Sequence, residues 1–151
     1  MTMQSSQAGA GSNSSNDFWI LIARILATAV FIKYGYPKLI DPTAILSYGG
    51  TKHFMSIVAG GAPAPIMLGY LIGAVETLGG IAILVGFKTR WVACAFVLYL
   101  ILITYLSHNF WDMEGAARGM NESHFYKNMA IMAGFILLTI MGPGRISVDR
   151  R

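Results

Sequence analysis

The sequence predicts an all-α integral membrane protein: an antiparallel bundle of four transmembrane helices, with short interfacial helices in the first loop. Of the 151 residues, 55% are hydrophobic and only 12% are charged, whereas charged residues make up about 25% of an ordinary soluble domain. So little charge cannot cover a surface that faces water. The 17 glycines agree with this class, because glycine is more frequent in membrane helices than in soluble ones. The length allows a single domain.

Four apolar segments are expected to be the transmembrane helices, at about residues 18–36, 66–87, 91–110 and 125–141. Each has the length that a hydrocarbon core of about 30 Å requires. Asn16 or Asp17 can cap the first helix, and the second helix follows Pro63 and Pro65, which favour a helix start. The third contains no formal charge when His108 is neutral. A Gly-Pro-Gly sequence after residue 141 ends the fourth.

The connecting segments fix how these helices are arranged. The first loop carries two short helical signals, at 41–48 and 51–59, which we interpret as interfacial turns and not as a fifth span. The connection at 86–90 is so short that the second and third helices must form an antiparallel hairpin, and the connection at 107–124 is polar and acidic. The membrane domain is therefore expected over residues 18–144, between a disordered tail at 1–17 and a basic tail at 145–151.

The two ends of the chain carry information about membrane orientation. The N-terminal tail has no Lys or Arg, so we do not expect a cleaved signal peptide. Lys and Arg are equally numerous in the loops on the two sides of the membrane. The short turn with Lys88 and Arg90 is nevertheless dense in positive charge, and the opposite loops also carry Asp41, Asp112 and Glu114. Because positively charged loops stay in the cytoplasm, we predict that both termini are cytoplasmic.

The composition excludes several classes of site. Cys94 is the only cysteine, which excludes an internal disulfide, a CxxC redox pair and a thiolate-rich metal site. We expect no metal site and no covalently bound cofactor, and the positions of His53, His108 and His124 argue against haem. No catalytic triad or phosphate-binding loop is visible, so any redox chemistry must come from a bound cofactor or a partner. No segment has the basic and aromatic pattern that nucleic-acid binding needs.

Two charged residues within the predicted spans need a physical explanation. Arg24 and Glu76 each cost about 2.5 to 3.5 kcal/mol at mid-helix, so such residues usually face the bundle and find a partner. Gly69, Gly73 and Gly80 share a face with Glu76 and allow another helix to approach the carboxylate closely. A structural Arg24–Glu76 ion pair is one interpretation. Alternatively, Glu76 accepts protons or binds a headgroup, and Arg24 reaches towards the membrane interface.

A second group of polar residues lies near the end of the third helix. Tyr105, His108 and Asn109 occur there, and Lys127 and Asn128 open the fourth helix on the same side of the membrane. A quinone head needs one or two hydrogen-bond donors beside apolar and aromatic walls, and these residues are candidates for such a quinone or headgroup pocket. They equally fit an ordinary interfacial belt of aromatic and polar side chains.

Several short motifs occur in a specific order between residues 18 and 149. They are Arg24; Gly35 and Lys38; Pro63 and Pro65; Glu76 to Gly80; Gly86, Thr89 and Arg90; Lys127 and Asn128; and the sequence from Gly142 to Asp149. This series resembles the DoxX family of small four-helix bacterial membrane proteins. The resemblance implies an antiparallel four-helix bundle in the bacterial cytoplasmic (inner) membrane. It does not explain the N-terminal tail or residues 112–123.

The resemblance leaves two functional classes open. The family takes its name from a subunit linked to a thiosulfate:quinone oxidoreductase, and other relatives accompany membrane oxidoreductases. It therefore implies a quinone-linked component, in which a membrane or peripheral partner carries the redox cofactor and this chain supplies the anchor or quinone site. The alternative is a noncatalytic accessory or assembly subunit that packs against a larger complex through its glycines. A solute carrier is disfavoured, because four helices without a repeat give little material for alternating access.

Overall fold

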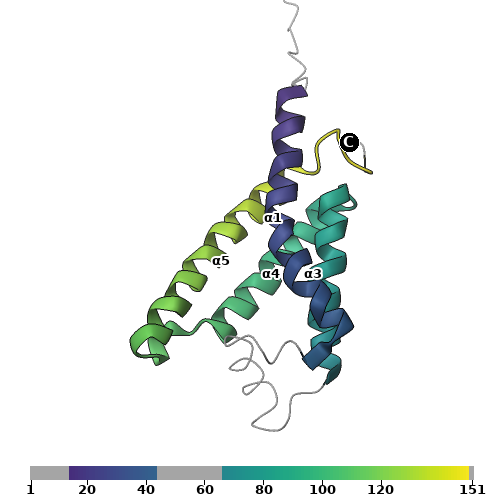
Figure 1. The fold of residues 1–151 in the computed structure, drawn as a ribbon. Helices are drawn as coiled ribbons and strands as arrows, with labels where there is room; N and C mark the ends of the chain where they lie inside the picture. The colour runs from purple at the N-terminus through teal and green to yellow at the C-terminus, as the bar shows by residue number, and fades with distance from the viewer. Residues whose placement is uncertain (1–13, 44–65, 150–151) are drawn as a thin grey trace, which may run out of the picture.

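Four long helices make up the bundle in the computed structural model, which describes residues 14–43 and 66–149 (Figure 1). They are α1 (Ser14–Ile40), α3 (Ile66–Val85), α4 (Thr89–Ser107) and α5 (Gly115–Met141), with a short 3-10 helix, η2 (Phe110–Asp112), before α5. All four long helices are long and apolar enough to cross a membrane, and the described ranges contain no strand. The predicted class, an all-α membrane bundle, is confirmed. The interfacial turns expected beyond Thr43 and most of the N-terminal tail lie outside the described residues.

Two helices extend further than the sequence pattern predicted. The first was expected to end at residue 36, before Pro37, but α1 continues through this proline to Ile40, and the Asp41 N–H donates to the Pro37 carbonyl over 2.9 Å. The fourth was expected from residue 125, but α5 begins at Gly115. Its additional turns are polar and carry no apolar stripe, although Ala116, Ala117 and Arg118 are strong helix formers. Much of the connection expected at 107–124 is therefore helical.

The helices form two antiparallel pairs, α1 with α3 and α4 with α5. The glycine face of α3 packs on α1: a Cβ atom added to Gly73 would lie 2.9 Å from Lys38 Cβ, and one added to Gly80 would lie 2.9 Å from Ile32 Cγ1. Gly69 lies in the same way against Pro42. The absence of side chains on this face thus lets the backbones of α1 and α3 approach closely.

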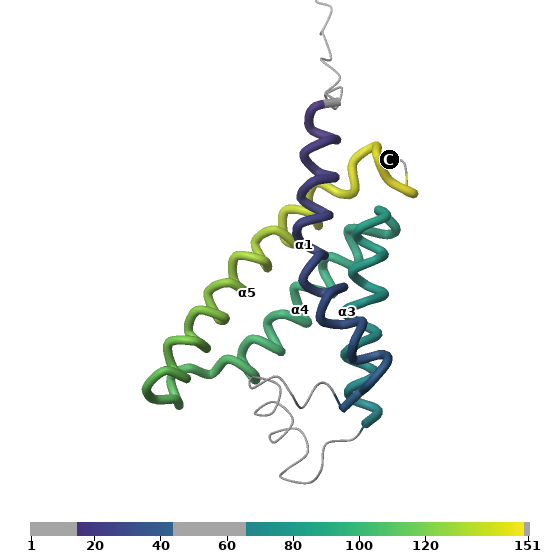
Figure 2. Tube along the Cα trace, in the orientation of Figure 1, coloured from purple at the N-terminus to yellow at the C-terminus, as the bar shows by residue number. Residues whose placement is uncertain are grey.

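A cluster of aromatic and aliphatic side chains joins the two pairs. The rings of Phe31 and Phe96 have centroids 4.8 Å apart, and those of Phe96 and Phe135 are 5.0 Å apart. Ile83 and Leu138 are buried around them. Figure 2 shows that the pairs meet near the end of the molecule that holds the C-terminus and separate towards the other end.

Candidate functional site

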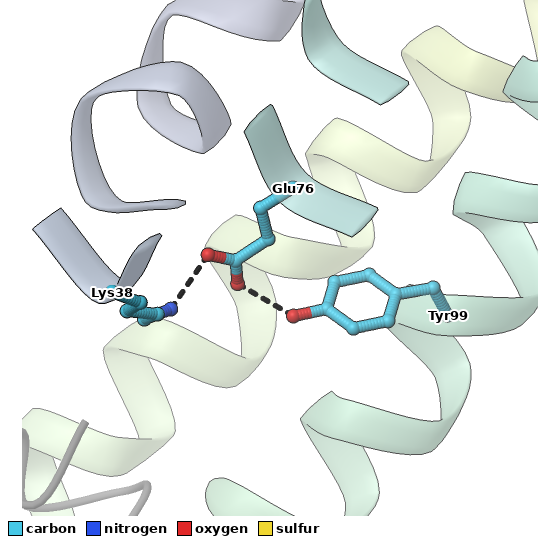
Figure 3. A network of polar contacts seen from close by, with 3 residues as sticks. All are labelled: Lys38, Glu76 and Tyr99. Carbon is cyan, nitrogen blue, oxygen red and sulfur yellow. Dashed lines mark hydrogen bonds and ion pairs between the residues drawn. The ribbon is translucent and has the colours of Figure 1, made fainter. Parts of the chain in front are cut away.

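A network of three polar side chains lies inside the bundle (Figure 3). The Lys38 ammonium donates to Glu76 Oε2 over 2.6 Å, and the Tyr99 hydroxyl donates to Glu76 Oε1 over 2.5 Å. The side chains of Lys38 and Glu76 are only 8% and 10% exposed. Three helices, α1, α3 and α4, each supply one member, so the network connects both helix pairs.

The two ionised members of this network occupy different positions in their helices: Lys38 lies in the last turn of α1. Glu76 lies at the midpoint of α3, about 15 Å from the start of the helix at 1.5 Å per residue. Lys38 reaches it because α1 continues beyond Pro37 and keeps Lys38 on the face that packs against α3. Gly35 provides the space: a Cβ atom there would lie 2.7 Å from Glu76 Cβ. Both carboxylate oxygens are therefore satisfied in an environment where an unpaired charge is costly.

The predicted ion pair between Arg24 and Glu76 is wrong, because Lys38 holds the carboxylate. Lys38 was not expected as the partner because the first helix was predicted to end before Pro37. Tyr99 was not expected because the pattern of the third span, which carries no charge, does not distinguish it from the apolar residues around it. The spacing from Gly35 to Lys38 was the available signal, since residues three apart share a helix face.

Arg24 has a different environment, at the end of the molecule that holds the C-terminus. Its side chain is fully enclosed and donates to four backbone carbonyls: those of Ile83 and Leu84 at the end of α3, and those of Pro143 and Ile146 beyond α5. The last carbonyls of a helix lack helical partners and attract positive charge. Arg24 therefore supplies hydrogen bonds to the last carbonyls of α3 and holds the C-terminal segment beside them.

Other bonds hold the same C-terminal segment. The N–H of Val148 donates to the Val85 carbonyl over 3.0 Å, and that of Asp149 to the Gly86 carbonyl over 3.2 Å. The Arg145 N–H donates to Asp17 Oδ1 over 2.9 Å. The start of α1, the turn between α3 and α4 and the C-terminal segment thus lie at one end of the molecule.

The five residues predicted to form a quinone or headgroup pocket are divided among separate interactions. His108 Nδ1 lies 3.0 Å from Asn121 Oδ1, and the Asn109 amide donates to Asp112 Oδ2 over 3.0 Å. The Asn128 amide donates to Thr104 Oγ1 over 2.9 Å. Tyr105 is 63% exposed, with its ring centroid 5.5 Å from that of Trp111.

Lys127, the fifth predicted residue, is exposed on α5 and borders a shallow hollow of about 580 Å³. Tyr105, His108, Asn109 and Asn128 are not among the described residues that line this hollow. A quinone pocket formed by these five residues stays a prediction. Two neighbouring atoms, Ser107 Oγ and Asn109 Oδ1, are buried and have no hydrogen-bond partner in the described part of the chain.

Within the described part of the chain, the residues that line the hollow beside Lys127 all belong to α5. Gly119, Ser123, Tyr126 and Ala130 also line it, and a Cβ atom added to Gly119 would meet no other atom within 4 Å. Of the four spans, α5 buries the smallest share of its apolar stretch, 11% against 22% to 39% for the others. The outer face of α5 is therefore open, whereas the glycine face of α3 is filled by α1.

Comparison with known proteins identifies the relatives of this chain. The DoxX family model matches residues 19–109. Two proteins of Escherichia coli are similar over most of their length: inner membrane protein YphA, 39% identical over 87% of this chain and 89% of its own, and inner membrane protein YqjF, 40% identical over 89% and 92%. The uncharacterized membrane protein Rv3486 of Mycobacterium tuberculosis is 30% identical over 87% of this chain and 80% of its own. No solved structure matches the chain.

Proposed function

Because the chain belongs to the DoxX family and its relatives are inner membrane proteins, we propose that it is a noncatalytic accessory subunit of a quinone-linked oxidoreductase in the bacterial cytoplasmic membrane. In this proposal, the partner carries the redox cofactor and the quinone site. This chain supplies a membrane anchor that packs against one of the partner's transmembrane helices. Both of its termini lie in the cytoplasm.

The open outer face of α5 is the observation that supports this proposal. Small residues recur along it at Gly119, Ser123, Ala130 and Gly134, and a Cβ atom added to Gly134 would meet nothing within 4 Å. Because lipid tails are as apolar as helix side chains, membrane helices associate through close packing at small residues. We expect a partner helix to lie in the hollow along this face.

The polar groups on the same face support a protein partner over lipid. Glu122 and Lys127 border the hollow together with Ser123, near the membrane boundary opposite the C-terminal segment. The Ser123 hydroxyl already donates to the Gly119 carbonyl over 2.9 Å, whereas Glu122 and Lys127 offer a partner helix one charge of each sign.

The glycines of α3 do not serve this docking role, although the sequence suggested that they pack against a larger complex. Gly73 and Gly80 already face α1, and Gly69 faces Pro42 just beyond it; added Cβ atoms would collide with these neighbours. A partner can reach this face only by displacing α1. The docking surface is therefore assigned to the other helix pair.

A leucine on the open face tests this function. The Gly134→Leu variant should fold normally, but its side chain should prevent a partner helix from approaching. In membranes solubilised with a mild detergent, the wild-type chain should migrate on a native gel with a quinone-reducing activity, and the variant should not. Ala95→Leu, on the exposed face of α4, is the matched control and should migrate as the wild type. Co-migration of the Gly134→Leu variant with the activity would contradict the proposal.

A second candidate function is that the chain itself contacts the quinone. The buried, unpartnered Ser107 Oγ and Asn109 Oδ1 favour it, because a hydroxyl and an amide oxygen can bond the polar groups of a quinone or quinol. If this region binds the head, His108→Ala and Asn109→Ala should weaken quinone binding by about 1 to 3 kcal/mol, the usual cost of an unsatisfied buried group. A purified chain that binds no quinone would exclude this role while leaving the accessory role intact.

A further inference from the structure

A second hollow lies at the opposite end of the bundle, beside the turn between α3 and α4. Its volume is about 470 Å³. It is lined by residues 88–91 and, from the end of α5 and the segment after it, by Met141, Pro143 and Asp149. Two of the wall residues, Lys88 and Arg90, are cationic and exposed. None of the proposed docking residues on α5 takes part in it.

The first turn of α4 opens into this hollow without a cap. Lys88 precedes the helix in a left-handed conformation with φ 43°, and no side chain caps the helix start. The backbone N–H groups of Thr89 and Arg90 belong to the first turn, where a helix offers them no acceptor. Together with the helix dipole, such groups favour a bound anion.

The Thr89 hydroxyl supplies independent evidence for a ligand. Thr89 is 0% exposed and lines the hollow, yet its Oγ1 atom has no hydrogen-bond partner among the residues the structure describes. Buried hydroxyl groups in proteins are usually bonded, and each exception requires an explanation. A ligand oxygen in the hollow would satisfy it.

The charges around the hollow favour a monovalent or divalent anion. Lys88 and Arg90 make no ion pair over residues 14–43 and 66–149, where Lys38–Glu76 is the ion pair found. Asp149 is the acidic group in the wall, and its N–H is bonded to the Gly86 carbonyl. Two cations, a helix start and one carboxylate thus border the hollow, which leaves a net positive site; the Arg90 guanidinium also donates to the Met141 carbonyl over 3.4 Å.

From these observations we propose that the hollow binds a phosphate group, carried by an anionic phospholipid. Free phosphate has the same chemistry, but the position of Trp91 favours a lipid. This side chain is 79% exposed at the end of a membrane span, where tryptophan typically lies at the level of the headgroups. A phospholipid could place its phosphate between Lys88 and Arg90 and its acyl chains along α4.

Fluorescence of Trp91 gives a direct test. With Trp19→Phe and Trp111→Phe as the background, Trp91 is the only tryptophan, and its quenching reports which lipids lie beside it. The protein is reconstituted in vesicles of phosphatidylcholine and phosphatidylglycerol, in which one or the other lipid carries brominated chains. Brominated phosphatidylglycerol should quench several-fold more effectively than brominated phosphatidylcholine. Lys88→Gln or Arg90→Gln should each reduce this preference about fivefold, as expected for one basic residue near an anionic surface.

Further variants separate the pocket from general surface charge. Thr89→Val keeps the shape of the side chain but removes the hydroxyl, and should also lower the preference for phosphatidylglycerol. Lys33→Gln, an exposed lysine on α1, should leave it unchanged. Equal quenching by the two brominated lipids, or an equal effect of Lys33→Gln, would overturn the proposal. Loss of the preference in millimolar inorganic phosphate would assign the site to free phosphate and contradict the lipid.

Discussion

At the scale of single residues, the Lys38 ammonium, the Glu76 carboxylate and the Tyr99 hydroxyl satisfy one another in the middle of an apolar bundle. Removal of one partner from a buried ion pair typically costs about 3 to 5 kcal/mol, whereas replacement of both partners by uncharged groups is often neutral. The network therefore specifies the contact between helices more than it adds net stability. It fixes α1 and α4 on either side of α3.

The first prediction concerns this ion pair. Glu76→Gln should lower the free energy of unfolding by about 3 to 5 kcal/mol, because Lys38 loses its carboxylate in the bundle interior. Adding Lys38→Met should restore most of that loss. Unfolding in mixed micelles of mild detergent and dodecyl sulfate measures both variants, with exposed Lys33→Met as the control. Purely additive losses in the double variant would show that the two residues are not coupled.

The second prediction concerns Arg24. A lysine at this position keeps the charge but lacks the planar fork that reaches carbonyls of α3 and of the C-terminal segment together. Arg24→Lys should therefore loosen that segment. A cysteine placed at Ser147, in a Cys94→Ser background, should react faster with a thiol reagent when Arg24 is replaced. Thr139→Val, which removes a hydroxyl bonded within α5, is the control. An unchanged rate of thiol reaction with Arg24→Lys would show that Arg24 does not hold the C-terminal segment in place.

The sequence predicted that Arg24 and Glu76 needed partners, because charged residues are costly within a span. It did not predict which partners they have. Among the residues that the structure describes, Arg24 donates only to backbone carbonyls, and these carry no sequence signal. Lys38 was placed outside the first helix, because proline usually marks the end of a helix. Local patterns thus identified the residues that need stabilisation, while the contacts between helices determined how each is stabilised.

At the scale of helices, the two glycine-rich surfaces have opposite roles. The glycine face of α3 is closed by α1, and the small residues of α5 face open space. The sequence reveals small residues on both helices, but it does not show which surface is filled within the chain. The polar start of α5 was missed for a related reason: an exposed polar helix lacks the apolar periodicity that identifies helices.

The third prediction compares equal substitutions on these two surfaces. Gly73→Leu should destabilise the bundle by about 1 to 3 kcal/mol or more, the usual cost of overpacking, because the Gly35 carbonyl lies 3.0 Å from the added Cβ position. Gly134→Leu should leave stability unchanged or slightly raised, since leucine favours helix more than glycine does. Thermal unfolding in detergent gives both values. Equal losses would show that α5 is packed as closely as α3.

At the scale of the whole molecule, the arrangement places both ends of the described chain on one side of the membrane. Asp17 bonds Arg145, Val148 bonds Val85 at the end of α3, and Asp149 bonds Gly86 in the turn between α3 and α4. The turn with Lys88 and Arg90 is on that side as well, so the positive charge there favours a cytoplasmic position. The fold class and the family followed from the order of the apolar segments and motifs. Only the packed structure shows that the outer face of α5 is open.

The fourth prediction concerns this orientation. In a Cys94→Ser background, a cysteine at Met113, near η2, should react with a membrane-impermeant thiol reagent in intact cells. A cysteine at Val148, which is exposed at the other end, should react only after the cells are lysed. The reverse pattern would place the termini outside the cytoplasm, and with them the proposed phospholipid pocket.

Site-specific photocrosslinking from α5 tests the proposed accessory function most directly. A photoreactive amino acid replaces Ala130, which borders the open hollow, and a matched variant carries it at Leu98, which is 65% exposed on α4. After illumination of native membranes, Ala130 should form an adduct with a transmembrane subunit of a cofactor-containing, quinone-reducing complex. Leu98 should form none, and Gly134→Leu should abolish the Ala130 adduct. Adducts from Ala130 only with lipid or with another copy of this chain would contradict the accessory function.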